Sequence, residues 1–207
     1  MGWTECGDMP VESKADLKRY ADALYSEDIH EWDGCICTDK VLVRRRVLKS
    51  SIAKGTWYGA IENTTLETGK TDVWAGVCLV GKSEDGCFLY KDISESSLPC
   101  YYDCPKSVLD LLSPTDNEYA LAWRQKCRSA LSEKAERKRF TSRLRDFAKT
   151  GKPVTWTAFA CNVYDAGDKV RLWPMTSPKG RIEWCDPFSR VHVPTKHLTA
   201  ENVAFHA

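Results

Sequence analysis

The sequence lacks long apolar stretches and the short motifs of common catalytic and phosphate-binding sites. No apolar run approaches the ~18 residues that a membrane-spanning helix needs, so we expect no membrane partner. The N-terminal residues contain neither the basic nor the apolar part of a secretory signal, which predicts a cytoplasmic protein. A glycine-rich phosphate loop, a nucleophile elbow and an H-E-x-x-H helix are missing, so the enzyme classes that use them are disfavoured.

The spacing of cysteine and histidine does not match that of common metal sites. Two cysteine pairs and one histidine pair are close in the sequence: Cys35 and Cys37, Cys100 and Cys104, and His192 and His197. Neither cysteine pair has the C-x2-C spacing of zinc knuckles. Pro194 lies between the two histidines, so they do not share a helical face. We therefore predict no metal and no cofactor.

Cysteine is nevertheless abundant, with ten residues. Thiols stay reduced in the cytosol, so a disulfide framework is not expected. Cys78 in "VWAGVCLV" and Cys161 in "TAFACNVY" lie within apolar runs, where a free cysteine acts as a small buried residue. We predict that most of the cysteines fill the core.

One group of residues resembles a catalytic set in composition only. Cys185, Asp186 and His192 are the nearest approach to a nucleophile, an orienting carboxylate and a base. Cys185 lies in a strand-like run, and the Asp-Pro pair that follows it is typical of a turn. An enzyme, such as a nuclease or a hydrolase, is therefore the least favoured of three hypotheses.

Charge is unevenly distributed along the chain, although the net charge is only +1. Residues 1–123 carry 13 Lys and Arg against 21 Asp and Glu, whereas residues 124–152 carry 11 against 3. Residues 153–207 are nearly balanced, with 6 against 5. This division indicates either internal pairing of the two charged parts or a directed binding surface.

The N-terminal part alternates between one helix and a series of strands. Residues 13–26 have apolar residues at spacings of three and four, and Ser13 is a suitable N-cap. Three segments rich in β-branched and aromatic residues follow, 40–53, 55–65 and 72–81, and residues 86–93 fit a fourth. Short polar separators join them, which predicts an antiparallel meander.

Helical patterns return after Pro99. Residues 105–112 predict a short helix that stops at the Ser-Pro pair following it. Thr115 and Glu118 form a capping-box pattern that opens a second helical region, which ends before Gly151. Its apolar positions are sparse between residues 135 and 140, so either one long helix or two shorter helices fit.

The remaining residues predict a small all-β region. Strand-like segments occur at 154–164, 169–175, 181–185 and 190–194, separated by turn clusters. We therefore expect an α+β domain over residues 1–150 that ends in a charged helix. Residues 151–207 are expected to form a small β domain of SH3-like size.

The second helical region carries a dense group of basic residues, here called the basic segment: Lys134, Arg137, Lys138, Arg139, Arg143 and Arg145. Spacings of four and seven place some of them on one face, where they could neutralise several phosphates. A solvated face that pairs with the acidic N-terminal half fits equally well. Three further arginines, residues 44–46, could extend either interpretation.

The tryptophans divide into two groups by their sequence context. Four alternate with polar residues in strand-like runs and are expected in the core: Trp57, Trp74, Trp156 and Trp173. Trp3 and Trp32 lie in less regular sequence, and we interpret them as candidate exposed anchors for a partner.

A longer motif covers residues 99–127, "PCYYDCPKSVLDLLSPTDNEYALAWRQKC". Its core consists of Tyr101, Tyr102, Asp103, Cys104 and Pro105. Pro99 and Pro105 flank a tight passage from sheet to helix, so we expect the tyrosines to pack there and the aspartate to lie near a helix N-terminus. The motif is interpreted as structural.

Together with the "MGWTE" start, this motif resembles an uncharacterised family carried by phages, plasmids and conjugative elements. The resemblance implies a protein of a mobile element that acts in the cytoplasm of a bacterial host, and it supplies no catalytic residues. The leading hypothesis is a non-enzymatic protein that binds host nucleic-acid machinery, including an inhibitor of CRISPR or restriction defence. Direct binding of DNA or RNA is the alternative.

Overall fold

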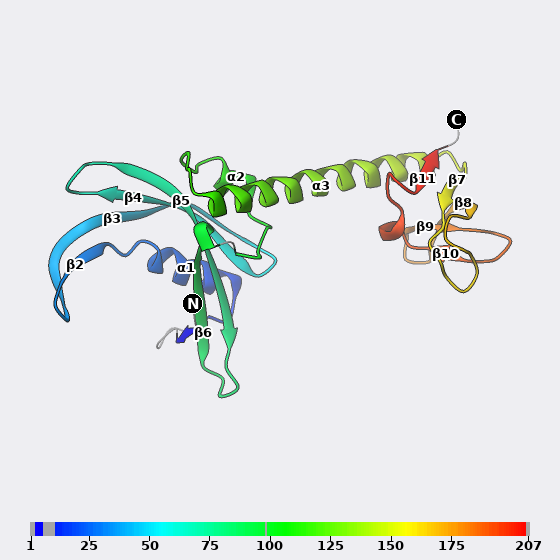
Figure 1. Ribbon diagram of the computed structural model, residues 1–207. Helices are drawn as coiled ribbons and strands as arrows, with labels where there is room; N and C mark the ends of the chain where they lie inside the picture. The colour runs from blue at the N-terminus through cyan, green and yellow to red at the C-terminus, as the bar shows by residue number, and fades with distance from the viewer. Residues whose placement is uncertain (1–2, 6–10, 98, 206–207) are drawn as a thin grey trace. The chain divides into compact units, whose positions relative to one another are not determined.

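The computed structural model describes residues 3–5, 11–97 and 99–205. It has an α+β fold with two antiparallel sheets and three α-helices (Figure 1). The chain divides into two compact units, Met1–Leu131 and Ser132–Ala207, here called the N-terminal and C-terminal units. Among the described residues, no helix is long and apolar enough to cross a membrane.

The N-terminal unit contains a six-stranded antiparallel sheet with the order β1-β6-β5-β4-β3-β2. Its strands are β1 (Thr4–Glu5), β2 (Ile29–Asp33), β3 (Ile36–Ala53), β4 (Thr56–Thr65), β5 (Thr71–Lys82) and β6 (Phe88–Ser94). Strands β3 to β6 are neighbours in chain order, so the predicted meander is confirmed, whereas β2 at its start was not predicted. Lys54 and Gly55 both have positive φ angles at the β3–β4 turn, as a two-residue type I′ hairpin requires.

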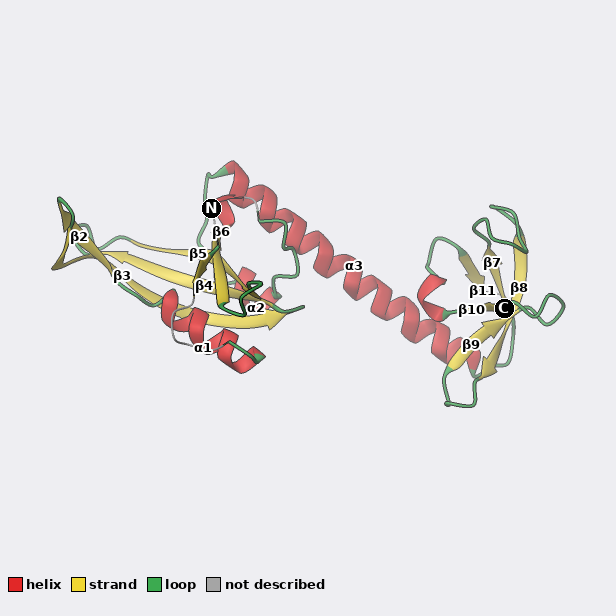
Figure 2. Cartoon of the chain, turned by 90° about the horizontal axis from the view of Figure 1, so that it is seen from below, coloured by secondary structure: helices red, strands yellow, loops and turns green. Residues whose placement is uncertain are grey.

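Both faces of this sheet are covered. Helix α1 (Lys14–Leu24) lies on one face, as Figure 2 shows, and contributes Leu17 and Ala21 to the core. Its predicted N-cap is confirmed, because Ser13 forms a complete capping box with Asp16. The other face packs against the segment that contains Cys104 and the start of the long helix. Burial on both sides explains why the first six residues of β4 are buried on consecutive positions rather than on alternate ones.

A close approach of aromatic rings fixes two glycines in the sheet. The rings of Tyr25 and Trp57 stack with centroids 4.8 Å apart. Gly59 and Gly76 are cross-strand partners, and a Cβ atom at either position would collide with these rings or with Ile61. The missing side chains therefore make room for the aromatic pair.

Two further helices follow the sheet. Helix α2 (Lys106–Leu109) is shorter than predicted, and α3 (Glu118–Ala148) is one continuous helix, which decides between the two alternatives. The predicted cap of α3 was wrong. The Oδ1 atom of Asn117 accepts the hydrogen bond of the Ala120 amide, whereas Thr115 accepts from Asn117 itself. Asparagine is an equally good N-cap, so the helix begins two residues later than the Thr-x-x-Glu pattern indicated.

The C-terminal unit contains a five-stranded antiparallel sheet with the order β10-β9-β8-β7-β11. Its strands are β7 (Val154–Thr157), β8 (Lys169–Thr176), β9 (Ile182–Cys185), β10 (His192–Val193) and β11 (Val203–Phe205). The turn η2 (Thr195–His197) follows β10. The predicted strand over residues 154–164 ends early at Thr157, and β11 was not predicted at all.

The second half of α3 belongs to the C-terminal unit. Leu144 is buried with Trp156, Leu172 and Trp184, and Phe140 packs against the same cluster. The expected boundary near residue 150 corresponds to the end of α3. The two compact units instead divide between Leu131 and Ser132, inside the helix. The physical reason is that the apolar face of the helix completes the small β core.

The cysteines are less buried than predicted. Four of the nine described cysteines are buried: Cys78, Cys104, Cys127 and Cys185. The other five are exposed: Cys35, Cys37, Cys87, Cys100 and Cys161. Cys78 agrees with the prediction, but Cys161 does not, because β7 has ended and the chain has entered a loop. Cys6 lies outside the described residues.

The tryptophans follow the predicted division more closely. Trp57 and Trp156 are fully buried, whereas Trp74 and Trp173 are half-buried. Trp32 is 67% exposed in the hairpin of β2 and β3, and Trp3 is 51% exposed. Their exposure agrees with the interpretation as surface residues, and a role as anchors stays a prediction.

Candidate functional site

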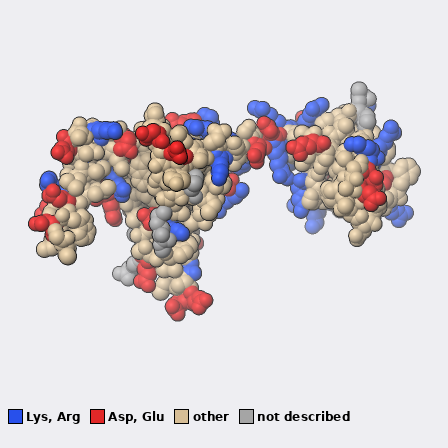
Figure 3. Space-filling model, viewed as in Figure 1, with Lys and Arg blue, Asp and Glu red and all other residues tan. Residues whose placement is uncertain are grey.

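The basic segment lies entirely on the second half of α3, and all six of its side chains are exposed. Lys and Arg side chains gather along this helix on the face of the C-terminal unit seen in Figure 3. The unit carries 14 Lys and Arg against 8 Asp and Glu, a net charge of +6. A surface of this sign attracts polyanions over the distance of a Debye length.

The arginines of the basic segment differ in the groups that they contact. The guanidinium of Arg143 lies 4.3 Å from the ring centroid of Phe205, in a cation–π contact. Arg137 donates a hydrogen bond of 3.0 Å to the carbonyl oxygen of Lys196. Arg145 instead borders a cleft on the sheet. The structure therefore positions three of the arginines differently.

The cleft beside Arg145 has a volume of about 430 Å³. Arg181 and Gly180 border it from the β8–β9 turn, and Thr195 borders it from η2. Trp184 also lines it, and the Nε1 atom of that buried tryptophan has no hydrogen-bond partner among the described residues. The Thr195 hydroxyl donates to the carbonyl of Ile182, so the two guanidinium groups are the donors available to oxygen atoms of an anionic ligand.

Arg181 also borders a second cleft with His192 and Glu183. The Nδ1 atom of His192 lies 3.5 Å from a carboxylate oxygen of Glu183. This carboxylate is the acidic group closest in sequence to Arg181, so it limits the positive potential on that side. The cleft beside Arg145 is consequently the better candidate for binding an anion.

The cations of the basic segment are not neutralised within the described part of the chain. None of the six basic residues forms a salt bridge with any residue of 3–5, 11–97 or 99–205. The arginines at positions 44–46 behave differently. Arg46 pairs with Glu62 at 2.8 Å, Arg44 lies 4.0 Å from Asp28, and Arg45 contacts the Trp74 ring. The basic segment of α3 is therefore less constrained by carboxylates than the arginines at positions 44–46.

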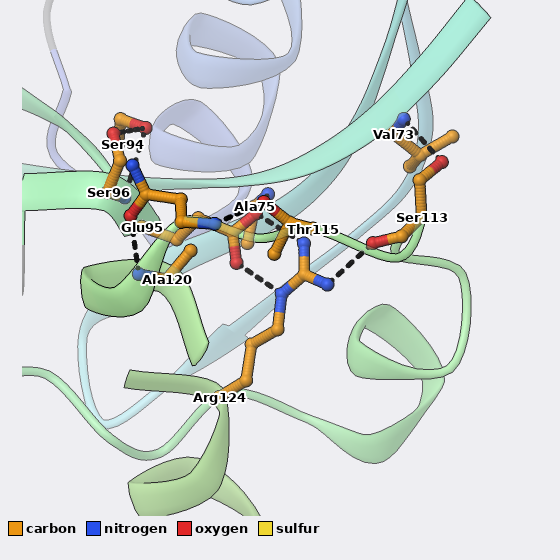
Figure 4. A network of polar contacts seen from close by, with 10 residues as sticks. Val73, Ala75, Ser94, Glu95, Ser96, Ser113, Thr115, Ala120 and Arg124 are labelled. Carbon is orange, nitrogen blue, oxygen red and sulfur yellow. Dashed lines mark hydrogen bonds and ion pairs between the residues drawn. The ribbon is translucent and has the colours of Figure 1, made fainter. Parts of the chain in front are cut away.

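A different arginine of α3 is buried and paired. Arg124 is 5% exposed, and its Nε and Nη2 atoms donate to the two carboxylate oxygens of Glu95 over 2.6 and 2.7 Å (Figure 4). Its Nη1 atom donates to the carbonyl of Ser113 over 2.6 Å. The amide of Ala75 also donates to Glu95. This network connects β5, the turn η1 (Glu95–Ser97), the loop before α3 and α3 itself.

A polar cleft of about 520 Å³ lies beside this network. Lys70, Asp72 and Asp116 line it with Arg124 and Glu95, so both signs of charge are present. Both buried charges already satisfy each other, and the mixed rim gives no preference for an anion or a cation. The arrangement stabilises the junction of sheet and helix, and it was not predicted because 29 residues separate Glu95 and Arg124.

The "CYYDCP" corner makes packing and hydrogen-bond contacts with the start of α3. The carbonyl of Tyr101 accepts a hydrogen bond of 3.0 Å from the Trp123 indole. The Lys126 ammonium lies 5.2 Å from the centroid of the Tyr102 ring. Asp103 lies two residues before Pro105, the N-cap residue of α2, so its expected position near a helix N-terminus is confirmed.

The Asp103 carboxylate also pairs with Lys54 of the β3–β4 turn at 2.9 Å. Cys104 is buried with Cys127 in the same core cluster, and Pro105 is the N-cap residue of α2. Burial raises the pKa of the Cys104 thiol and raises that of Cys127 to about 12. Both thiols are thus uncharged near neutral pH, as suits core packing.

The set of Cys185, Asp186 and His192 does not form a catalytic arrangement. Burial raises the pKa of the Cys185 thiol, whereas a nucleophilic cysteine requires a lowered one. Asp186 directs its oxygens to Tyr164 and Ser189 rather than to a histidine. In the described ranges, no three side chains of His, Cys, Asp or Glu converge as metal ligands.

No model of a protein family, no curated protein and no solved structure matches the chain. The candidate site therefore depends on geometry and charge alone. The basic segment is evident in the sequence, whereas Arg181 was not predicted as a site residue and lies 36 residues after Arg145. Only its position in a Pro-Lys-Gly-Arg turn between two strands could have placed it at the edge of the small sheet.

Proposed function

We propose that the protein is a non-enzymatic binding protein that acts on nucleic-acid machinery and contacts nucleic acid through its C-terminal unit. The observation that supports this is the set of exposed cations of the basic segment, which form no salt bridge with a described residue, together with the Arg145–Arg181 cleft. Phosphates are the most abundant partners for such a surface, because each arginine can hold two of their oxygens. In this proposal the five strands of the unit form a small barrel of SH3-like size.

A salt titration of oligonucleotide binding tests the proposal. Fluorescence anisotropy would measure the binding of labelled DNA and RNA at salt concentrations between about 50 and 200 mM, a range over which the affinity for phosphates falls steeply. The test variant replaces Lys138, Arg145 and Arg181 by glutamine. Each lost phosphate contact lowers the slope of log K against log salt by about 0.7–0.9, so we expect a reduction of about 2 and at least tenfold weaker binding.

The matched control replaces Arg44 and Arg46 by glutamine. These arginines are also exposed, but each lies near a carboxylate of its own unit. Their replacement should leave the affinity and the slope unchanged. Failure of the wild-type chain to bind any oligonucleotide would reject direct contact, as would an unchanged slope in the triple variant.

A second candidate function concerns the N-terminal unit, which carries 16 Lys and Arg against 21 Asp and Glu. An acidic surface can occupy a basic channel that normally holds nucleic acid. With the resemblance of the motif at Tyr101–Pro105 to mobile-element proteins, this supports an inhibitor of host defence, such as a CRISPR or restriction complex, in the cytoplasm of a bacterial host. Recovery of a defence or nucleic-acid-processing complex with the tagged chain tests it, and its absence would reject it.

A further inference from the structure

The turn between β9 and β10 displays an aromatic ring to solvent. Phe188 is 88% exposed, the highest exposure among the large hydrophobic residues described for this chain. The sequence places it in "CDPFSRV", two residues before Arg190. An exposed phenyl ring forgoes the free energy that its burial would provide. A binding partner that covers the ring would recover this free energy.

A buried carboxylate holds this turn in one conformation. Asp186 is 8% exposed and accepts a 3.0 Å hydrogen bond from the Phe188 amide and a 3.3 Å bond from the Ser189 amide. The hydroxyl groups of Tyr164 and Ser189 each donate to it over 2.7 Å. Two backbone amides of the turn are therefore bonded to the Asp186 carboxylate, and the two hydroxyl groups hold that carboxylate in place.

The following residue adds a charge and a strained backbone. Arg190 has a φ of +58°, in the left-handed region that a residue with a side chain rarely adopts. The Asp186 amide donates to the carbonyl of Val191 over 3.0 Å, which closes the turn around this residue. Arg190 is exposed and forms no salt bridge with another described residue. An aromatic ring and a free guanidinium thus project from one rigid turn.

We propose that Phe188 stacks on an unpaired nucleobase, so that the C-terminal unit prefers single-stranded over double-stranded nucleic acid. This inference rests on the proposed function, because the basic segment and Arg190 supply the phosphate contacts. Base stacking on an exposed aromatic ring beside cations is the usual basis of single-strand binding. In a duplex the faces of the bases are covered by their neighbours, so the ring finds no partner there. A pre-formed turn avoids the entropy of ordering it on binding.

The test compares a single strand with a hairpin duplex of equal length, using the full chain. The single strand carries 2-aminopurine, whose fluorescence is quenched by stacking on an aromatic ring. Two variants separate stacking from apolar contact: Phe188→Leu keeps an apolar side chain without a π face, and Phe188→Tyr keeps the ring. Both lie at an exposed position and should fold normally.

We expect the wild-type chain to bind the single strand more tightly and to quench the probe. Phe188→Leu should weaken single-strand binding about tenfold, leave duplex binding unchanged and abolish the quenching. Phe188→Tyr should retain both. Equal effects of Phe188→Leu on single strand and duplex would overturn the proposal.

The outcome distinguishes this inference from the proposed function. If the variant of Lys138, Arg145 and Arg181 loses salt-dependent binding while Phe188→Leu binds like the wild type, only the stacking inference fails. If the wild-type chain binds neither oligonucleotide, the proposed function fails as well. If the Phe188 ring contacts a protein partner rather than a base, the 2-aminopurine fluorescence stays unquenched, and this result would contradict stacking.

Discussion

The two halves of helix α3 use their arginines in opposite ways. Arg124, in the N-terminal unit, is buried and donates to a carboxylate and a carbonyl of its own unit. Arg145, in the C-terminal unit, is exposed at a cleft and forms no salt bridge with a described residue. Burial commits the first arginine to structure, because an unpaired buried charge is costly, and exposure leaves the second for a partner. Residue type alone does not distinguish them.

The largest expected effect comes from breaking the buried pair. Arg124→Met leaves the Glu95 carboxylate buried without its partner, and we expect a loss of about 4 kcal/mol in the free energy of unfolding of the N-terminal unit. Amide hydrogen exchange in β4 and β5 would measure the loss, with β7 and β8 as the internal reference. Unchanged exchange in β4 and β5 would show that the pair does not stabilise the unit.

The control for this variant replaces both partners by methionine. A well-packed apolar pair avoids the unpaired charge, so most of the lost stability should return. If the double variant is as unstable as the single one, packing rather than the unpaired charge is responsible.

A core substitution in the other half of α3 should act on the other unit. Leu144→Ala removes a buried side chain from the cluster around Trp156 and Trp184. We expect the C-terminal unit to lose about 3 kcal/mol, because the cavity is added to the lost transfer free energy. Exchange should rise in β7 and β8 and stay constant in β4 and β5. A rise in both units would contradict the division inside α3.

The sequence predicted what depends on local pattern. The cap at Ser13, the strands of the meander and the basic segment all follow from periodicity and residue type within a few neighbours. It did not predict contacts that only the fold creates, such as the pair of Glu95 with Arg124 or the cleft shared by Arg145 and Arg181. The cysteines illustrate the same limit, because an apolar neighbourhood in sequence does not ensure burial once a strand ends, as at Cys161.

The turn that carries Phe188 should depend on pH. Burial by itself raises the pKa of Asp186, but hydrogen bonds from Tyr164, Ser189 and the Phe188 amide outweigh it and lower the pKa to about 2. The ordinary value is 3.8. The carboxylate therefore stabilises the folded C-terminal unit fully above about pH 5, and this contribution disappears as the pH falls through 2.

Thermal unfolding, followed by the NMR signal of the Trp184 indole N–H, should show a loss of stability of the C-terminal unit between pH 5 and pH 2. Solvent near the turn reduces the contribution, so we expect about 1 kcal/mol. Asp186→Asn should be less stable at neutral pH and should show a weaker dependence on pH in that range. An equal pH dependence in the variant and the wild type would assign the effect to other carboxylates.

The smallest effects compare two cations whose backbones adopt the same unusual conformation. Lys54 has a φ of +49° and pairs with Asp103, whereas Arg190 has a φ of +58° and forms no salt bridge with a described residue. Asparagine adopts positive φ more readily than either residue, so its introduction relieves strain at both sites. Arg190→Asn should therefore stabilise its unit by about 0.5 kcal/mol, while Lys54→Asn should change little because the lost surface ion pair offsets the gain.

Chemical denaturation of both variants, with Lys54→Met to isolate the ion pair, measures these differences. Stability gained at Arg190 together with weaker binding of a single strand would show that the wild-type turn retains a strained arginine for contact with a partner. Equal gains in stability at both sites would mean that the Lys54–Asp103 ion pair does not stabilise the fold. The difference between paired and free cations seen on α3 would then not apply to these two turns.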